Sequence, residues 1–148
     1  MNSIIFFIFF SVSWIFLFFF KFDTAYLETL KLPFFMPPLF IWKIVDIIVI
    51  LSNIFLVIKL FIKKEMNSAI FKENMIVYLL NIAFVITLFF FQNIGLSAIL
   101  MIFIFIDSIS YYGEVAKVND KDTIFLNIYV LWCLYLAASI ATLYLLNS

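Results

Sequence analysis

Long apolar stretches separated by short polar clusters constrain this chain more than any other feature of its sequence. A helix that crosses a bilayer needs about 20 mainly apolar residues. Five stretches reach about that length, at residues 2–20, 38–62, 75–91, 96–112 and 123–146. The chain is 68% hydrophobic and 12% charged, and a soluble domain of this size cannot bury so much apolar surface. The sequence therefore predicts an all-α membrane protein, in which residues 1–148 form one five-transmembrane-helix bundle.

Charge and residue usage narrow the classes of function. Nine lysines balance nine acidic residues, and a net charge of zero argues against a nucleic-acid partner. The chain has no histidine and a single cysteine, Cys133, which leaves no usual set of transition-metal ligands. It also has no Ser/His/Asp or Cys/His arrangement and no glycine-rich phosphate loop. We therefore expect no catalytic residues, no metal site and no required cofactor.

Four connections join the predicted helices. Residues 21–37 form a loop that ends in prolines, which fit the first turn of the next helix. Residues 63–74 are polar, and residues 92–95 predict a tight turn. Residues 114–122 form a hydrophilic loop after Gly113, which we interpret as a helix C-cap.

Lysines in these connections predict the orientation, because loops rich in lysine are retained in the cytoplasm. The connections after the second and fourth helices carry five lysines, and the opposite side carries two, Lys21 and Lys31. We therefore expect a multi-pass protein of the cell membrane with a cytoplasmic N-terminus. The C-terminus and the loop at residues 21–37 would face outward.

Ionisable and amide side chains within the spans are candidates for function, because they are costly at membrane depth. Lys43 and Asp46 lie three residues apart on one helix face. They form either a local ion pair near the outer interface or part of a polar cavity lining. We interpret Asp107 as a helix-end or interfacial carboxylate, with a place in a transport path as the alternative. Asn81 is expected to hydrogen-bond either another helix or a ligand.

The last predicted helix carries an aromatic and hydroxyl stripe. Trp132, Tyr135, Ser139 and Thr142 follow one another at spacings of 3, 4 and 3 residues, which places them on one face. An inward-facing aromatic shelf beside small hydroxyls suits a flat, mostly apolar ligand. Plain packing between helices is the alternative interpretation.

Three segments resemble motifs of the TspO/MBR family, the tryptophan-rich sensory and translocator proteins. Residues 30–38, Leu-Lys-Leu-Pro-Phe-Phe-Met-Pro-Pro, are similar to the family's first-loop motif. Residues 79–84 contain a Leu-Leu-Asn run and Phe84, similar to its third-helix region. Residues 129–132, Tyr-Val-Leu-Trp, with Tyr135, are similar to its fifth-helix signature. The resemblance implies a five-helix bundle with the first loop closing over an outward-opening cavity.

The same resemblance implies a hydrophobic, planar ligand of the porphyrin or tetrapyrrole class, bound by a sensor, regulator or receptor. Trp132 and Tyr135 would stack on the ligand, the loop would act as a lid, Asn81 would hydrogen-bond a polar edge, and Asp46 would pair with a cationic or N–H group. The residues expected to bind it are Tyr26, Phe35, Pro37, Pro38, Trp42, Asp46, Asn81, Phe84, Trp132, Tyr135 and Ser139.

Departures from the family pattern keep other functions open. Leu32 stands where the family has lysine, and Ile128 where it has proline. The family's second-helix tryptophan falls on Asp46, with Trp42 one turn earlier, so light-driven porphyrin breakdown is not the first expectation. A small multi-pass transporter or transporter subunit that uses Asp46 and Lys43 is the main alternative. A purely structural subunit and a homodimer also remain open, and the one certain partner class is the lipid bilayer.

Overall fold

Four helices in the described chain are long and apolar enough to cross a membrane. A computed structural model describes Ile5 and residues 25–148. The four helices are α3 (Leu39–Ile62), α4 (Ser68–Val85), α5 (Ile94–Val118) and α6 (Ile124–Asn147). The prediction of an all-α fold is confirmed for the described residues, which contain no strand, and the length and apolar composition of the four helices are consistent with a membrane protein. Apart from Ile5, the predicted helix at residues 2–20 lies outside them.

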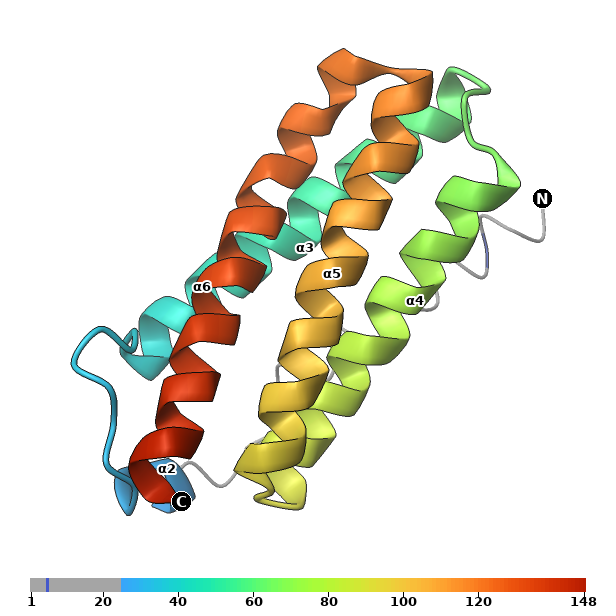
Figure 1. The fold of residues 1–148 in the computed structure, drawn as a ribbon. Coiled ribbons are helices and arrows are strands. Elements are labelled where there is room, and N and C mark those ends of the chain that lie inside the picture. Colours follow the sequence, from blue (N-terminus) through green and yellow to red (C-terminus); the bar gives the residue numbers. More distant parts are fainter. Residues whose placement is uncertain (1–4, 6–24) are drawn as a thin grey trace.

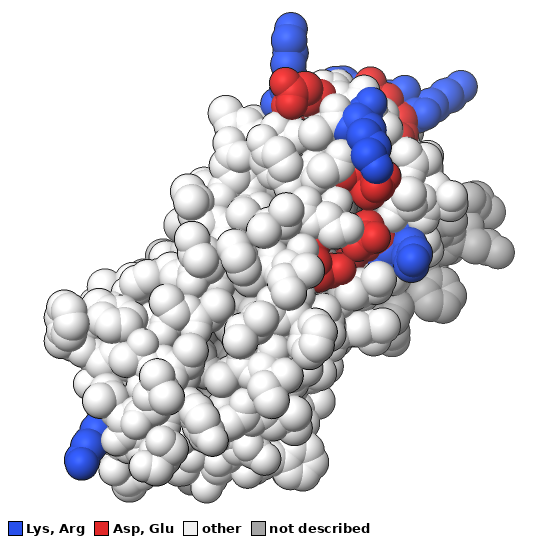
Figure 2. Space-filling view, in the orientation of Figure 1, with Lys and Arg blue, Asp and Glu red and all other residues white. Residues whose placement is uncertain are grey.

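Short helical segments join the long helices. One turn, α2 (Ala25–Glu28), precedes α3, a wider π-helical turn (Ile86–Phe90) continues α4, and a 3-10 turn (Asp120–Thr123) leads into α6. In Figure 1, α5 lies between α4 and α6, and α3 crosses behind and packs against α6. The α3–α4 and α5–α6 connections share one end of the bundle, while α2 and the C-terminus lie at the other. Charged side chains gather toward the first end on the face shown in Figure 2.

Helix α4 begins at Ser68, so the polar segment predicted at residues 63–74 is helical in its second half. The side chain of Asn67 caps the helix by accepting a hydrogen bond from the Ile70 backbone N–H at 2.9 Å. Ile70 and Asn74 are fully buried, whereas Lys72 is exposed. Residues 68–74 are polar enough to suggest a loop, but they form the amphipathic first two turns of α4, with one face buried.

Gly113 does not end α5, which continues to Val118. Val115, two residues after Gly113, is fully buried. Lys117 Nζ lies 2.5 Å from a Glu114 carboxylate oxygen. A glycine inside a helix costs about 1 kcal/mol, while burying a valine contributes about 1.5 kcal/mol or more. Packing of the extra turn therefore outweighs the glycine, and the C-cap interpretation is wrong.

The turn between α4 and α5 depends on Gln92 and Asn93 rather than on glycine. Gln92 has a φ of 54°, and the Asn93 side chain accepts a hydrogen bond from the Leu96 backbone N–H at 3.0 Å. Gly95 lies inside the first turn of α5. A Cβ atom there would lie 3.2 Å from Cε2 of Tyr144, so this glycine allows the close approach of α5 and α6.

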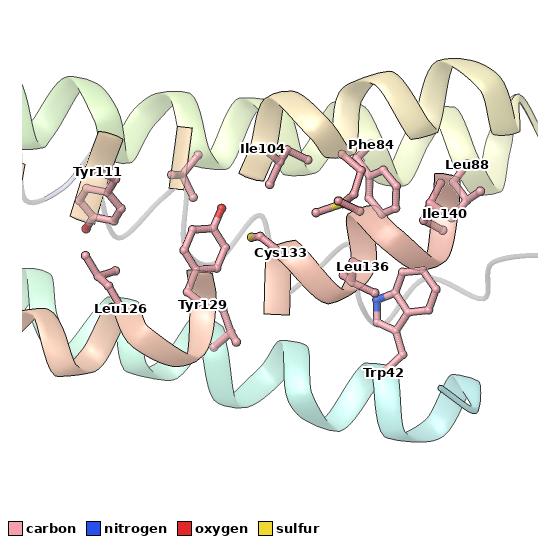
Figure 3. Packing of buried hydrophobic residues seen from close by; sticks show 14 of the residues in the cluster. Trp42, Phe84, Leu88, Ile104, Tyr111, Leu126, Tyr129, Cys133, Leu136 and Ile140 are labelled. Carbon is pink, nitrogen blue, oxygen red and sulfur yellow. The ribbon is translucent and has the colours of Figure 1, made fainter. Parts of the chain in front are cut away.

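A continuous core runs along the interfaces of the four helices (Figure 3). Ile104 and Tyr111 of α5 are fully buried, as are Leu126 and Ile140 of α6. The outward faces carry exposed apolar side chains such as Leu131. In a bilayer those faces lose nothing by exposure, so helix association depends on close packing and on hydrogen bonds between helices. The polar contacts across the interfaces therefore carry most of the information about function.

Candidate functional site

Asp46 of α3 and Trp132 of α6 form a direct link between two spans. The indole Nε1–H of Trp132 donates a hydrogen bond to Asp46 Oδ1 at 2.6 Å, and both side chains are half-buried. An ionisable group within a span needs such a polar partner. Lys43 is exposed and forms no ion pair with Asp46. The interpretation of these two residues as a local ion pair is therefore wrong.

Tyr135 packs against Trp132 and also binds the loop that precedes α3. Its ring centroid lies 5.5 Å from that of Trp132, with the planes tilted by 34°. The Tyr135 hydroxyl donates a hydrogen bond to the backbone carbonyl of Phe35. Ser139 is fully buried, and its hydroxyl donates to the Tyr135 backbone carbonyl at 2.9 Å. That hydroxyl is therefore engaged by its own helix.

Two further contacts fasten the loop before α3. Asn147 of α6 accepts a hydrogen bond from the Lys31 backbone N–H at 2.9 Å and donates to the Lys31 carbonyl at 3.0 Å. The Tyr26 hydroxyl donates to the Gln92 carbonyl at 2.8 Å. Partial burial raises the pKa of Tyr26, which favours the protonated donor. Pro37 is half-buried and Pro38, directly before α3, is exposed.

Trp42 and Phe84 lie together in the core. The Trp42 ring stacks on Phe84 with a centroid distance of 6.4 Å and approaches Phe89 edge-on at 6.3 Å. Figure 3 shows Trp42 reaching from α3 toward Leu136 and the layer that contains Phe84. Trp42 is only 5% exposed, so its ring belongs to the buried core next to Asp46.

Asn81 contacts another helix. Its amide nitrogen donates to the Tyr129 hydroxyl of α6 at 3.2 Å and to the Val77 carbonyl of its own helix at 2.7 Å. Of the two expectations for Asn81, a hydrogen bond to another helix or to a ligand, the structure shows the first. The contact joins α4 to α6 at Tyr129, three residues before Trp132.

Asp107 lies well inside α5. The helix continues for eleven residues after it, to Val118, or about 16 Å at the rise of an α-helix. Asp107 is therefore not at a helix end, for the same reason that Gly113 is not a C-cap; its interpretation as an interfacial carboxylate stays a prediction. Its Oδ2 atom is buried without a hydrogen-bond partner among the described residues.

A buried network of amides and phenols joins three helices, and the sequence did not reveal it. The Tyr111 hydroxyl of α5 donates to Asn53 Oδ1 of α3 at 2.8 Å, and Asn53 Nδ2 donates to the Tyr78 hydroxyl of α4 at 3.1 Å. Asn74 Nδ2 of α4 donates to the Tyr111 hydroxyl at 2.8 Å. Asn74, Tyr78 and Asn81 follow each other at spacings of 4 and 3, a polar stripe that signals an interior face.

A charged cluster at the other end of α3 was also missed. The Asp122 carboxylate is 2% exposed and lies 2.5 Å from Lys59 Nζ and 3.2 Å from Lys63 Nζ. The two lysines lie four residues apart, on one face of α3. This spacing could have indicated a shared acidic partner, but nothing in the sequence identifies Asp122 as that partner.

The site that emerges combines a carboxylate, an indole and a phenol at the surface between α3 and α6. The predicted residues brought together there are Phe35, Asp46, Trp132 and Tyr135. The described residues hold no group of three or more His, Cys, Asp or Glu side chains that could bind a metal. No protein-family model matches this chain, and no curated protein matches it. The resemblance to the TspO/MBR family therefore rests on the motifs quoted above.

Proposed function

We propose that this chain is a TspO-like membrane protein that binds a hydrophobic, planar ligand of the porphyrin class, as a sensor or receptor. The observation that carries the proposal is the hydrogen bond from Trp132 to Asp46, with Tyr135 beside it. An aromatic shelf next to a carboxylate offers stacking together with one fixed polar contact. Ligand sites of this kind are mostly apolar with a few placed polar groups.

Accessibility supports the same proposal. Asp46, Trp132, Tyr135 and Phe35 are all half-buried, so each keeps surface that a ligand would cover. The loop carbonyl of Phe35 is bound by Tyr135, which suits a lid that opens when this bond is exchanged for contacts with a ligand. In this proposal the lid faces outward and the N-terminus is cytoplasmic, in the cell membrane.

The test is a titration of the purified protein with protoporphyrin IX, followed by the absorbance of the porphyrin itself. Trp132→Ala removes the shelf and also the donor that holds Asp46 in place. It should weaken binding at least tenfold, since aromatic stacking and one well-placed hydrogen bond from the ligand to Asp46 together supply about 1.4 kcal/mol or more. Asp46→Asn keeps an acceptor for the indole and removes the charge, so it separates the two contributions.

Leu131→Ala is the matched control, because Leu131 is the neighbouring residue and is 67% exposed. It should leave the affinity unchanged. Binding that rises linearly with porphyrin concentration, or that is the same in the wild type and Trp132→Ala, would show partition into the micelle and refute the site.

Transport is the second candidate function, and Asp107 favours it. The Asp107 carboxyl lies eleven residues from the end of α5, has one buried oxygen without a hydrogen-bond partner among the described residues, and interacts with the Glu73 carboxyl of α4. Two neighbouring acidic groups of this kind within a span would exchange a proton or accept a cation. In this function Asp46 and Lys43 form the outer part of the path. Proton-dependent flux into vesicles should then be lost in Asp46→Asn and in Asp107→Asn. The binding proposal instead predicts altered porphyrin affinity for Asp46→Asn and no flux in the wild type.

A further inference from the structure

A groove lies on the outer face of the bundle, between α3 and α6 and further along α3 than Asp46 of the proposed ligand site. It has a volume of about 480 Å³ and is lined by Leu51, Ser52, Ile54, Phe55, Ile58 and Phe125. That volume falls within the roughly 300–1,000 Å³ of small-ligand pockets. Three lining residues, Leu51, Phe55 and Ile58, are at least half exposed. On a span-length helix such a surface faces the acyl region of a bilayer.

The groove ends directly beneath a cation. The rings of Phe55 and Phe125 lie 5.1 Å apart, and Lys59 Nζ lies 5.3 Å from the centroid of the Phe125 ring. Phe125 thus belongs both to the apolar lining and to the contact with the ammonium group. An occupant of the groove that extends along α3 therefore reaches Lys59 first and Lys63 one helical turn later.

The cations at this end exceed the acidic groups available to them. Lys59 and Lys63 share the single carboxylate of Asp122, which is 2% exposed. The lysine side chains remain 33% and 38% exposed, and each ammonium has three N–H donors. Over residues 59–65 and 119–122 the chain carries four lysines and three acidic residues. One unit of positive charge is therefore left for a partner.

We propose that this groove binds an anionic phospholipid, with one acyl chain along the α3–α6 surface and the phosphate at Lys59 and Lys63. Lysine clusters where spans meet the interface attract anionic headgroups, and the side-chain stems of Lys59 and Lys63 allow their ammonium groups to reach that level. The predicted orientation places this end in the cytoplasm, on the side where anionic lipids carry the negative surface potential. Figure 2 shows charged side chains concentrated toward this end of the molecule.

A second copy of the chain fits the groove less well. Copies in one membrane share an orientation, so a two-fold interface through this face would place both lysine clusters at the same depth. Like charges set against each other across an interface are unfavourable. A phosphate in the same place would instead neutralise the excess charge.

The test is native mass spectrometry of the detergent-purified chain with dioleoyl phosphatidylglycerol and dioleoyl phosphatidylcholine, which differ only in the headgroup. We expect the anionic lipid to bind about fivefold more tightly or better. Lys63→Gln should remove that preference, while Lys59 still pairs with Asp122, and Lys63→Arg should restore it. Ile58→Trp fills the groove without changing charge, so it should weaken the binding of both lipids.

Two controls separate a site from general surface effects. Lys117→Gln removes a 70% exposed lysine from α5, and Ile99→Trp enlarges an exposed residue of α5; neither should change lipid affinity. Equal affinity for the two lipids, or an equal loss in Lys117→Gln, would overturn the proposal. So would a dimer that dissociates in Ile58→Trp, because a second copy would then occupy the groove.

Discussion

Replacing Asn53 with leucine tests whether the buried amide–phenol network fastens α3 to α4 and α5. Asn53 is 4% exposed and takes part in hydrogen bonds with Tyr111, Tyr78 and Asn74 at 2.8, 3.1 and 3.4 Å. Leucine has nearly the same volume but neither a donor nor an acceptor. The substitution therefore leaves two phenols and an amide without one of their partners in the core.

The cost follows from the number of contacts. Hydrogen bonds between membrane helices contribute about 0.6 kcal/mol each on average, with a maximum near 1.7 kcal/mol. Three of them give a loss of about 2 kcal/mol in the free energy of unfolding. Water cannot replace the lost partners as it would in a soluble protein, so we do not expect a smaller value.

The assay is reversible unfolding in mixed micelles, titrated with a denaturing detergent and followed by circular dichroism. Asn127→Leu on the exposed face of α6 is the matched control and should shift stability by less than about 0.5 kcal/mol. Adding Tyr111→Phe to Asn53→Leu should cost less than the sum of the two single changes, because each removes the same hydrogen bond. A loss in Asn53→Leu no larger than that of the control would refute the network's role.

Three further predictions use the same protein. Gly113→Ala should raise the unfolding free energy by about 1 kcal/mol, because the position is helical and an added Cβ meets nothing within 4 Å; unchanged or lower stability in the same titration would contradict this. Asp122→Asn should lower the unfolding free energy by about 1–2 kcal/mol, since Lys59 and Lys63 lose their shared carboxylate but remain partly hydrated. Asp122→Glu, which keeps the charge, should lose less, and unchanged stability in Asp122→Asn would contradict the prediction. Asn147→Ala should speed hydrogen exchange at the Lys31 amide, which loses its acceptor. Ser148→Ala is the control and should leave the exchange rate unchanged. Equal exchange rates in Asn147→Ala and the wild type would show that the Asn147–Lys31 hydrogen bonds do not protect the loop.

Apolar length predicts the four described spans because it is a property of each segment alone. Helix α6 starts at Ile124, one residue after the predicted start, and α3 starts at Leu39, also one residue after its predicted start. The boundaries that failed, at Ser68 and Val118, depend on tertiary contacts. Ile70 and Val115 are buried by neighbouring helices, and that burial extends each helix into sequence that looks like a loop.

For the polar contacts too, the sequence indicates some of the residues but not which of them meet. Trp132 and Asp46 stand out in the sequence because each is unusual in its own span, but their hydrogen bond joins residues 86 positions apart. The Asn53 and Asp122 clusters were missed because their members come from different helices, as far as 58 and 63 positions apart in the sequence. Only the packing of α3 against its neighbours shows which of them meet.

The loop before α3 is held mainly by residues that are synthesised long after it. Its contacts to Tyr135 and Asn147 span about a hundred positions of sequence, and α6 follows every other described helix during translation. The ribosome releases the loop and inserts three spans before either anchor exists. During that interval the N-terminal end of α3, with Asp46 and Trp42, has none of its α6 contacts, so its packing is completed only after α6 is made. A folding defect in α6 should therefore be detected at the loop, as early protease cleavage between Leu30 and Phe35.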